Sequence, residues 1–301
     1  MSVAANSLAG TLTDRLARVD VLIVNYNAGK WLARSVETVF PRHATEPNVI
    51  IVDNGSADDS LNTLESSISR TAQADRIKCD RVGHNTGFAA GVNRAAARAS
   101  REFLLILNPD CLIDPPVLAR LVDELDRHPE TAMVSGKVLD PDGKEQRGSR
   151  RHLPTPARIL NEMLRLGGEG IDTTWTPRPD HAVEVEAVSG ACMLVRRSAF
   201  VALGGMDERY PLHFEDLDLF SRLIDAGWKL RWVPEAEIKH AGGQSSATRP
   251  VAVLWAKYLG LWRYLNRHCT ESWPIWQRPF WLLALGVHAA ARTPFAWWSK
   301  R

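Results

Sequence analysis

The chain has few cysteines and almost no net charge, and each shortage excludes a class of protein. Its four cysteines are scattered without CxxC or CxxxC spacing, so neither a zinc site nor a disulfide framework is expected. Its 37 basic residues nearly balance 35 acidic ones, and the net charge of +2 gives no field strong enough to indicate nucleic acid as a partner.

Long apolar runs are also missing. The first 20 residues contain charged side chains, among them Asp14, Arg15 and Arg18, and no apolar run of the kind found in secretory signals, so a cytoplasmic protein is expected. The longest uncharged stretch near the C-terminus, residues 279–291, is much shorter than the roughly 20 residues needed to cross a bilayer. No membrane-spanning helix is predicted.

Two nucleotide-binding signatures are absent. No GxGxxG follows the first predicted strand and no GxxxxGK[ST] occurs, which argues against NAD-dependent enzymes and P-loop NTPases. Any phosphate group must therefore be held in another way.

What is present is an alternation of short apolar runs with helical patterns, typical of an α/β fold with a mainly parallel sheet. With 45% apolar residues, the chain has ample material for a buried core. A long segment rich in proline, glycine and arginine, residues 139–180, interrupts the alternation. Strands are expected over 19–24, 49–52, 76–82, 102–107, 183–188, 191–195, 228–233 and 237–240, and helices over 30–40, 59–70, 87–99, 115–127, 157–166 and 215–226.

The composition changes after Pro250. Seven of the 11 tryptophans and seven basic residues, against one acidic residue, fall in the last 51 positions. A basic, tryptophan-rich pair of helices is typical of a surface that lies on anionic lipid. The alternative is a helical pair that packs on the main domain or on a second subunit in a homodimer.

Polar residues follow several predicted strands, at the edge where parallel sheets bind ligands. Asn25 and Tyr26 follow the first strand, Asp53 follows the second, and Asn108 and Asp110 follow the fourth. Together with the loop from Asn85 to Gly87, they predict a nucleotide pocket. Carboxylate oxygens suit Mg²⁺ or Mn²⁺, so Asp110 is a candidate metal ligand, with helix capping as the alternative role.

A second group of candidates lies further along the chain. Glu215, Asp216 and Asp218 begin a predicted helix, where acids often do no more than cap. If they converge, they raise one another's proton affinity, and one of them could accept a proton from a hydroxyl nucleophile. His240 ends a strand and is a candidate ligand for metal or phosphate, although a lone histidine is more often structural.

The motifs together resemble family 2 glycosyltransferases of the GT-A fold. They occur in family order over about 225 residues, and the NPD and HFEDLDL segments are most similar to bacterial rhamnosyltransferases. The matching segments are VLIVNYNAGKWL, VIIVDNGSADDS, NTGFAAGVN, LLILNPD, VSGACMLVRRSAF, GGMDERYPLHFEDLDLFSRL and HAGGQSS.

The resemblance implies a role for each candidate. Asp53, Asn25 and Tyr26 would bind the base, and Asn85 and Gly87 would lie near the nucleotide. Asp110 would hold the metal and the diphosphate, with His240 as a further ligand. Asp216 would be the catalytic base, with Glu215 beside it. Gly190 and Ala191 would leave room for the donor sugar and the acceptor.

The sequence departs from the family pattern at Asn108, where the family carries the first aspartate of its DxD motif. The change removes one negative charge and weakens the expected hold on a metal. Arg147, Arg150 and Arg151 could neutralise part of the leaving diphosphate instead, or could simply form a solvated loop.

The implied activity is an inverting sugar transfer from a nucleotide-sugar to a hydroxyl of a saccharide or lipid-linked saccharide. The expected donor is dTDP-L-rhamnose, and the expected location is the inner face of the membrane. The alternatives are a UDP-sugar donor carrying glucose, GlcNAc or galactofuranose, and a non-catalytic membrane-bound scaffold. The expected divisions are an N-terminal extension (1–18), a GT-A domain (19–248) and an amphipathic helical extension (249–301).

Overall fold

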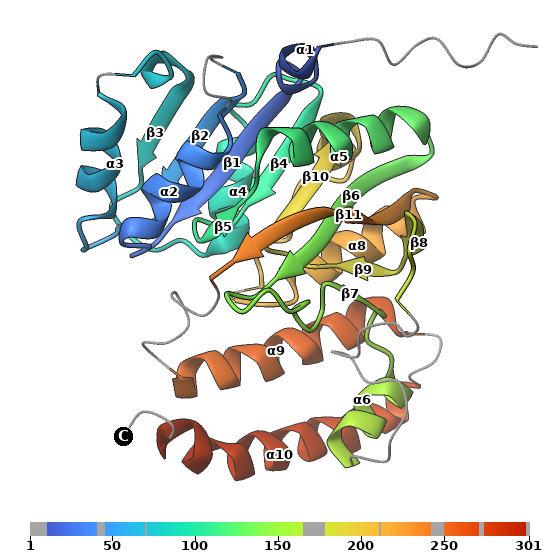
Figure 1. The fold of residues 1–301 in the computed structure, drawn as a ribbon. Coiled ribbons are helices and arrows are strands. Elements are labelled where there is room, and N and C mark those ends of the chain that lie inside the picture. Colours follow the sequence, from blue (N-terminus) through green and yellow to red (C-terminus); the bar gives the residue numbers. More distant parts are fainter. Residues whose placement is uncertain are drawn as a thin grey trace, which may run out of the picture.

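A nine-stranded mixed sheet forms the centre of the molecule in this computed structural model (Figure 1). The structure describes residues 11–40, 46–69, 71–164, 178–210, 212–241, 250–270 and 274–298. The start of the predicted N-terminal extension, part of the 139–180 segment and most of the HAGGQSS motif lie outside these residues.

The first half of the sheet is parallel. Strands β1 (Val19–Asn25), β2 (Asn48–Asp53), β3 (Ile77–Arg81) and β4 (Phe103–Leu107) lie in the order β3-β2-β1-β4. The apolar runs of β1, β2 and β4 are buried on both faces, as their continuous patterns predicted. The carboxyl ends of these strands therefore meet at one edge.

The second half of the sheet adds β10 (Cys192–Arg196), β6 (Thr131–Leu139) and β11 (Lys229–His240) beside β4, in that order. The last strand on this path is β5 (Cys111–Leu112), which begins shortly after β4 ends and yet pairs with the end of β11. The far side of the sheet therefore curls back to the carboxyl end of β4. Smaller strands are β8 (Val183–Val185), on β11, and a separate pair, β7 (Arg150–Arg151) and β9 (Ala187–Val188).

Helices cover both faces of the sheet, and each face has its own apolar core. One core packs α2 (Lys30–Thr38), α3 (Ser60–Ile68) and α5 (Pro115–Arg127) on odd-numbered residues of β1. The other packs α4 (Phe88–Ala96), α7 (Arg197–Ala202) and α8 (Glu215–Asp225) on even-numbered residues. This alternation follows from the two-residue period of a strand. The short helix α1 (Leu12–Leu16) is joined to α5 by an ion pair of Arg15 with Asp123.

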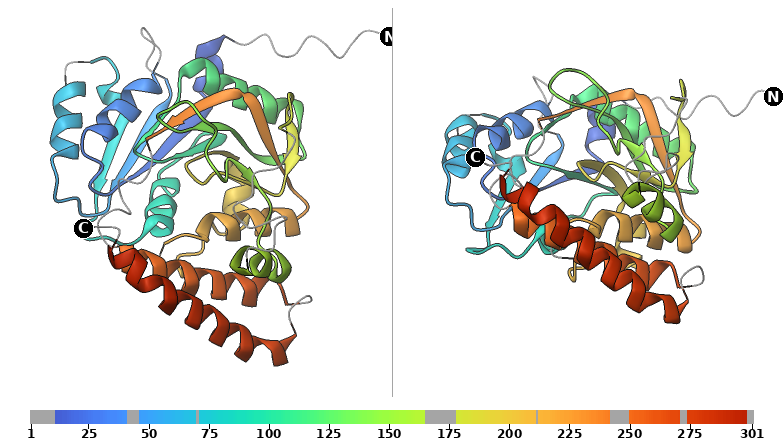
Figure 2. Two further views of the ribbon diagram at one scale, coloured as in Figure 1. Left: turned by 60° about the horizontal axis from the view of Figure 1, so that its bottom comes forward. Right: turned by 90° about the horizontal axis from the view of Figure 1, so that it is seen from below.

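Beyond α8 lie two antiparallel helices, α9 (Pro250–His268) and α10 (Arg278–Trp298), here called the C-terminal hairpin. In Figure 1 and in the left view of Figure 2 they run side by side below the domain, close to α6 (Pro156–Leu164). Buried residues of both helices join the second core, including Tyr264 and Leu285. None of the helices among the described residues is both long and apolar enough to cross a bilayer.

The sequence-based expectations differ from the structure in several strands. The strands β5, β6 and β7 were not predicted. The expected strands 228–233 and 237–240 are one strand, β11, with a bulge between Val233 and Glu237. The expected strand 183–188 is two strands, because β8 pairs with β11 whereas β9 pairs with β7. The fold class itself, a mixed α/β sheet flanked by helices with a helical C-terminal extension, is confirmed.

Candidate active site

The ends of β1 and β2 form a buried polar corner around Asn25 and Asp53. The Asn25 Nδ2 donates to Asp53 Oδ1 at 2.8 Å, and to the hydroxyls of Ser56 and Ser60 at 3.0 and 2.9 Å. The Ser56 N–H donates to the other oxygen of Asp53. Because Asn25 and Asp53 are almost fully buried, these bonds hold the Asp53 carboxylate in one orientation at the sheet edge. Tyr26, the next residue, is half-buried.

A loop from β3 to α4 lies beside this corner. Asn54 donates to the Gly87 carbonyl and accepts from Thr86 Oγ1, at 2.9 and 3.0 Å. Asn85 Oδ1 accepts from the Gly87 N–H at 2.9 Å. Gly87 has a φ of 91°, in the region that favours glycine, and directly precedes the first residue of α4. The structure thus brings Asn85 and Gly87 to the same edge as Asp53.

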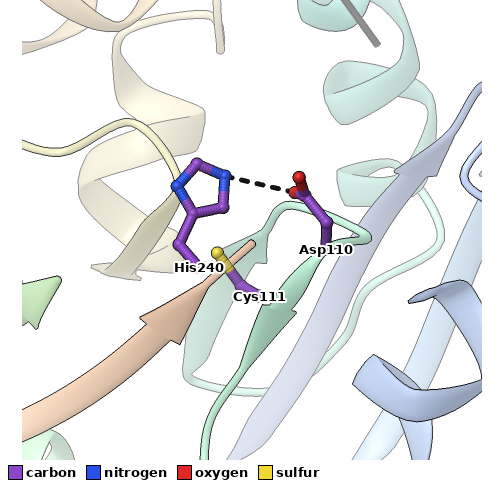
Figure 3. A group of neighbouring side chains, drawn as sticks. All are labelled: Asp110, Cys111 and His240. Atoms are coloured by element: carbon purple, nitrogen blue, oxygen red, sulfur yellow. Dashed lines mark ion pairs between the residues drawn. The ribbon is translucent and has the colours of Figure 1, made fainter. Parts of the chain in front are cut away.

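The turn between β4 and β5 meets the end of β11 at Asp110 and His240 (Figure 3). His240 Nε2 lies 3.2 Å from Asp110 Oδ1, and the sulfur of Cys111 completes a group whose ligand atoms all lie within 4.8 Å of one another. On its far side, His240 is held by Gln146, which pairs with His240 Nδ1 at 2.9 Å and with the His240 carbonyl at 3.0 Å. The bulge of β11 and the curl of the sheet therefore create a corner that can hold a cation.

The chemistry of these three side chains favours a hard or borderline cation. A carboxylate oxygen and an imidazole nitrogen both suit Mn²⁺, and a carboxylate suits Mg²⁺. Burial raises the pKa of the Cys111 thiol well above its ordinary value, so this sulfur is a neutral thiol and not the thiolate that binds metal strongly. Asn108 contributes no charge here. Its N–H donates to the Ala191 carbonyl at 2.8 Å, which fixes the strand end next to β10.

The first turn of α8 carries Glu215 and Asp216. Asp216 Oδ2 is 3.1 Å from Arg151 Nη2, and a side chain at Gly190 would place its Cβ 2.7 Å from the same oxygen. The absence of a side chain at Gly190 is therefore what makes room for the Asp216 carboxylate. Ala191, the next residue, is buried.

Glu215 has a different environment. Its side chain is buried, and Glu215 Oε2 has no hydrogen-bond partner among the described residues. Burial, and then the neighbouring Asp216 carboxylate, raise the pKa of Glu215 to about 8. Two adjacent carboxyl groups are thus held in different environments, with Glu215 neutral near pH 7.

The three candidate arginines, Arg147, Arg150 and Arg151, have different surroundings in the structure. Arg150 is buried, pairs with Glu145 and stacks on the Trp232 ring at 4.5 Å. Arg151, on the same short strand, reaches Asp216, whereas Arg147 is exposed. Arg151 is therefore the one of the three that the structure places at the candidate active site.

Comparison with known proteins assigns this arrangement to a family. Residues 20–203 match the model of glycosyl transferase family 2, a stretch that contains the Asn25 corner, Asp110 and Gly190. The chain belongs to glycosyl transferase family 2. It is therefore a glycosyltransferase, an enzyme that transfers a sugar.

Relatives of this glycosyltransferase include bacterial rhamnosyltransferases. It is 30% identical over 297 residues to the N-acetylglucosaminyl-diphospho-decaprenol L-rhamnosyltransferase of Mycobacterium tuberculosis, covering 91% of this chain and 92% of the relative. It is 24% identical to the O-antigen chain rhamnosyltransferase WbaN of Salmonella anatum, covering 73% and 65% of the two chains. The chain is thus similar to rhamnosyltransferases of polysaccharide synthesis.

The fold of the glycosyltransferase also matches a solved structure, the mannosyltransferase PcManGT of Pyrobaculum calidifontis in complex with GDP-Man and Mn²⁺. The TM-score is 0.58 at 15% identity, and the match covers 93% of this chain and 71% of that one. At this identity the likeness establishes the fold alone.

The sequence reasoning did not single out Gln146 or Ser60, although Ser56 was among the polar residues noted after the second strand. Gln146 lies 94 positions from its partner His240, so only the curled sheet reveals the pairing. Ser56 and Ser60 are small polar residues near a helix start, where their types indicate capping as readily as a pocket.

Proposed function

We propose that this glycosyltransferase transfers L-rhamnose from dTDP-L-rhamnose to a hydroxyl of a polyprenyl-linked saccharide, with inversion at the anomeric carbon. The observation that carries the proposal is the similarity over 91% of the chain to a rhamnosyltransferase whose name gives a lipid-linked acceptor. The alternative donor is a UDP-sugar, since the corner around Asp53 would accept either pyrimidine base. Membership of the family favours an enzyme over a non-catalytic scaffold.

Asp216 is the proposed catalytic base. It would take the proton of the acceptor hydroxyl as that oxygen attacks the anomeric carbon and the bond to the nucleoside diphosphate breaks. Arg151 Nη2, 3.1 Å from Asp216 Oδ2, orients this carboxylate within the site. Glu215 supports the same assignment because, as a neutral carboxyl, it leaves Asp216 as the group of the pair that can accept a proton.

Asp110 and His240 are the proposed ligands of a divalent cation, Mg²⁺ or Mn²⁺. When bound, the cation would supply positive charge to the leaving diphosphate. Asn25, Tyr26 and Asp53 are proposed to bind the base, Asn85, Gly87 and Asn108 to lie along the nucleotide, and Gly190 and Ala191 to border the sugar and the acceptor.

Donor binding and transfer would test this assignment. We expect metal-dependent binding of dTDP-L-rhamnose in preference to UDP-glucose, UDP-GlcNAc and GDP-mannose, with loss of binding in EDTA. Asp216→Asn should lower kcat by roughly 10²–10⁴-fold and spare donor binding, whereas Glu215→Gln should retain most activity. Full activity of Asp216→Asn would overturn the base, and preferential binding of a UDP-sugar would overturn the donor.

The C-terminal hairpin is proposed to rest on an anionic lipid surface, which would place the enzyme on the inner face of the membrane. Ten of the large apolar side chains that are more than a third exposed lie on α6, α9, α10 and the 3₁₀ turn Ile275–Gln277. The last 51 residues carry seven basic side chains against one acidic one, which complements anionic headgroups. The ten are Leu160, Leu164, Trp255, Leu259, Ile275, Trp276, Phe280, Leu282, Leu283 and Val287.

Point variants test this surface better than a truncation at Pro250, because α9 contributes buried Leu261, Tyr264 and Leu265 to the core. Replacing Phe280, Leu283 and Val287 with serine should abolish sedimentation with anionic vesicles. Serine at Val201 and Ile224, exposed apolar residues of α7 and α8, is the matched control. Unchanged sedimentation of the triple variant would refute lipid binding, and loss of a dimer instead would identify a second copy as the occupant.

A further inference from the structure

The turn that precedes α8, the helix that begins with Glu215 and Asp216, has an unusual backbone. His213 and Phe214 have φ angles of 65° and 71°, in the left-handed region, and neither is glycine. Residues other than glycine stay in this conformation only where their surroundings hold them there, and such residues gather at functional sites. Glu215 and Asp216 follow directly, so the direction of the Asp216 side chain depends on what holds this turn.

The C-terminal hairpin supplies that support through Gly260 of α9. A Cβ at Gly260 would lie 3.0 Å from Phe214 Cδ2 and 3.1 Å from the His213 carbonyl oxygen. Glycine weakens the interior of a helix, so its presence here is explained by the close approach of α9 to the turn.

Two further contacts continue along the same face of α9. Tyr264, one turn after Gly260, lies with its ring centroid 6.0 Å from that of Phe214, and its hydroxyl pairs with Ser221 Oγ at 2.7 Å. His268, one turn later, has Nε2 2.8 Å from Asp218 Oδ1. Positions four residues apart share one face of a helix, so this face of α9 meets the turn and α8.

The contact of His268 with Asp218 belongs to a cluster of polar side chains around the Asp218 carboxylate. The Asp218 side chain is fully buried, and besides His268 it accepts from Arg222 Nε at 2.7 Å and lies 3.2 Å from Arg267 Nη1. A buried carboxylate needs such partners, since an unpaired buried charge is strongly unfavourable. Two of the three partners come from α9, so the first turn of α8 is fastened to the C-terminal hairpin.

We infer that α9 is a positioning element of the active site, in which Gly260, Tyr264 and His268 hold the turn 213–214 and thereby aim Asp216. The inference rests on the proposed role of Asp216 as the base. It gives the hairpin a part in sugar transfer itself, in addition to any contact with lipid.

A pair of glycine variants tests the inference with a matched control. Gly260→Ala and Gly286→Ala both add a methyl group to a helix of the hairpin, but a Cβ at Gly286 meets nothing within 4 Å. We expect Gly286→Ala to keep the wild-type kcat. Gly260→Ala should lower kcat by roughly 10–100-fold, because a small displacement of a reacting group has a large effect on rate, and should leave donor KM and vesicle binding unchanged.

Substitutions at His268 provide a second test. His268→Ala removes the contact to Asp218 and should lower kcat, and His268→Gln should restore part of it because the amide can still donate to Asp218. A wild-type kcat in both Gly260→Ala and His268→Ala would overturn the inference, as would equal losses of kcat and donor binding in both. Failure of the wild-type enzyme to transfer any sugar would instead count against the proposed function.

Discussion

Glu215 makes stability depend on pH in a direction opposite to that of most carboxyl groups. Its pKa is raised from 4.5 to about 8 by burial and by Asp216. Between these values the folded protein keeps the proton while the unfolded chain releases it, so the free energy of unfolding falls as pH rises. The fall amounts to roughly 3 kcal/mol at pH 7 and roughly 5 kcal/mol above pH 8.

Replacing Glu215 with glutamine removes this effect, because the amide is neutral at every pH. We expect Glu215→Gln to match the wild type near pH 4.5 and to be progressively more stable up to pH 8. Urea unfolding of both proteins at several pH values measures the difference. Glu37→Gln, an exposed position on α2, is the control and should show no such trend. A difference that stays constant between pH 5 and 8 would refute the raised pKa.

Three further perturbations have distinct expected results. Gly190→Ala should lower kcat at unchanged donor KM, because its Cβ would lie 2.7 Å from Asp216 Oδ2; steady-state kinetics measures this, and an unchanged kcat would contradict it. Gln146→Ala should weaken Mn²⁺ binding by roughly 10–100-fold in calorimetry, because Gln146 orients the proposed ligand His240; equal affinity would show that Gln146 has no such role. Asp20→Ala should lower the free energy of unfolding by about 3 kcal/mol, because the buried carboxylate accepts from the Ser100 and Arg101 N–H groups; a loss below about 1 kcal/mol in urea unfolding would argue against this.

Most of the parallel half of the sheet could be predicted from the sequence, because strands buried on both faces are continuous apolar runs. The strand β6 could not, since Ser135, Gly136 and Lys137 break its apolar run. The structure gives tertiary reasons for two of them. Ser135 Oγ donates to the Cys192 carbonyl at 2.7 Å, and a Cβ at Gly136 would lie 2.0 Å from the carbonyl oxygen of Ala236. Local patterns do not contain such partners.

The candidate site, too, could be predicted from the sequence only in part. The positions of Asp53 and Asp110 follow from strand ends, which sequence patterns locate well. The partners that fix the side chains come from distant parts of the chain, such as Arg151 beside Asp216 and Gln146 beside His240. Whether Arg150 or Arg151 faces the site depended on the pairing of β7 with β9, which two residues of sequence cannot specify.

The bulge in β11 makes the spacing between the two proposed metal ligands, Asp110 and His240, sensitive to chain length. On β11, Val233 and Glu237 pair with the consecutive residues Gly136 and Lys137 of β6, so three extra residues lie between them. Side chains alternate between faces along a strand, so deleting one of these residues would turn His240 away from Asp110. Surface irregularities usually tolerate insertions and deletions. The bulge of β11 would not, and natural length variation at residues 234–236 would mark enzymes that have lost or rebuilt the proposed cation site.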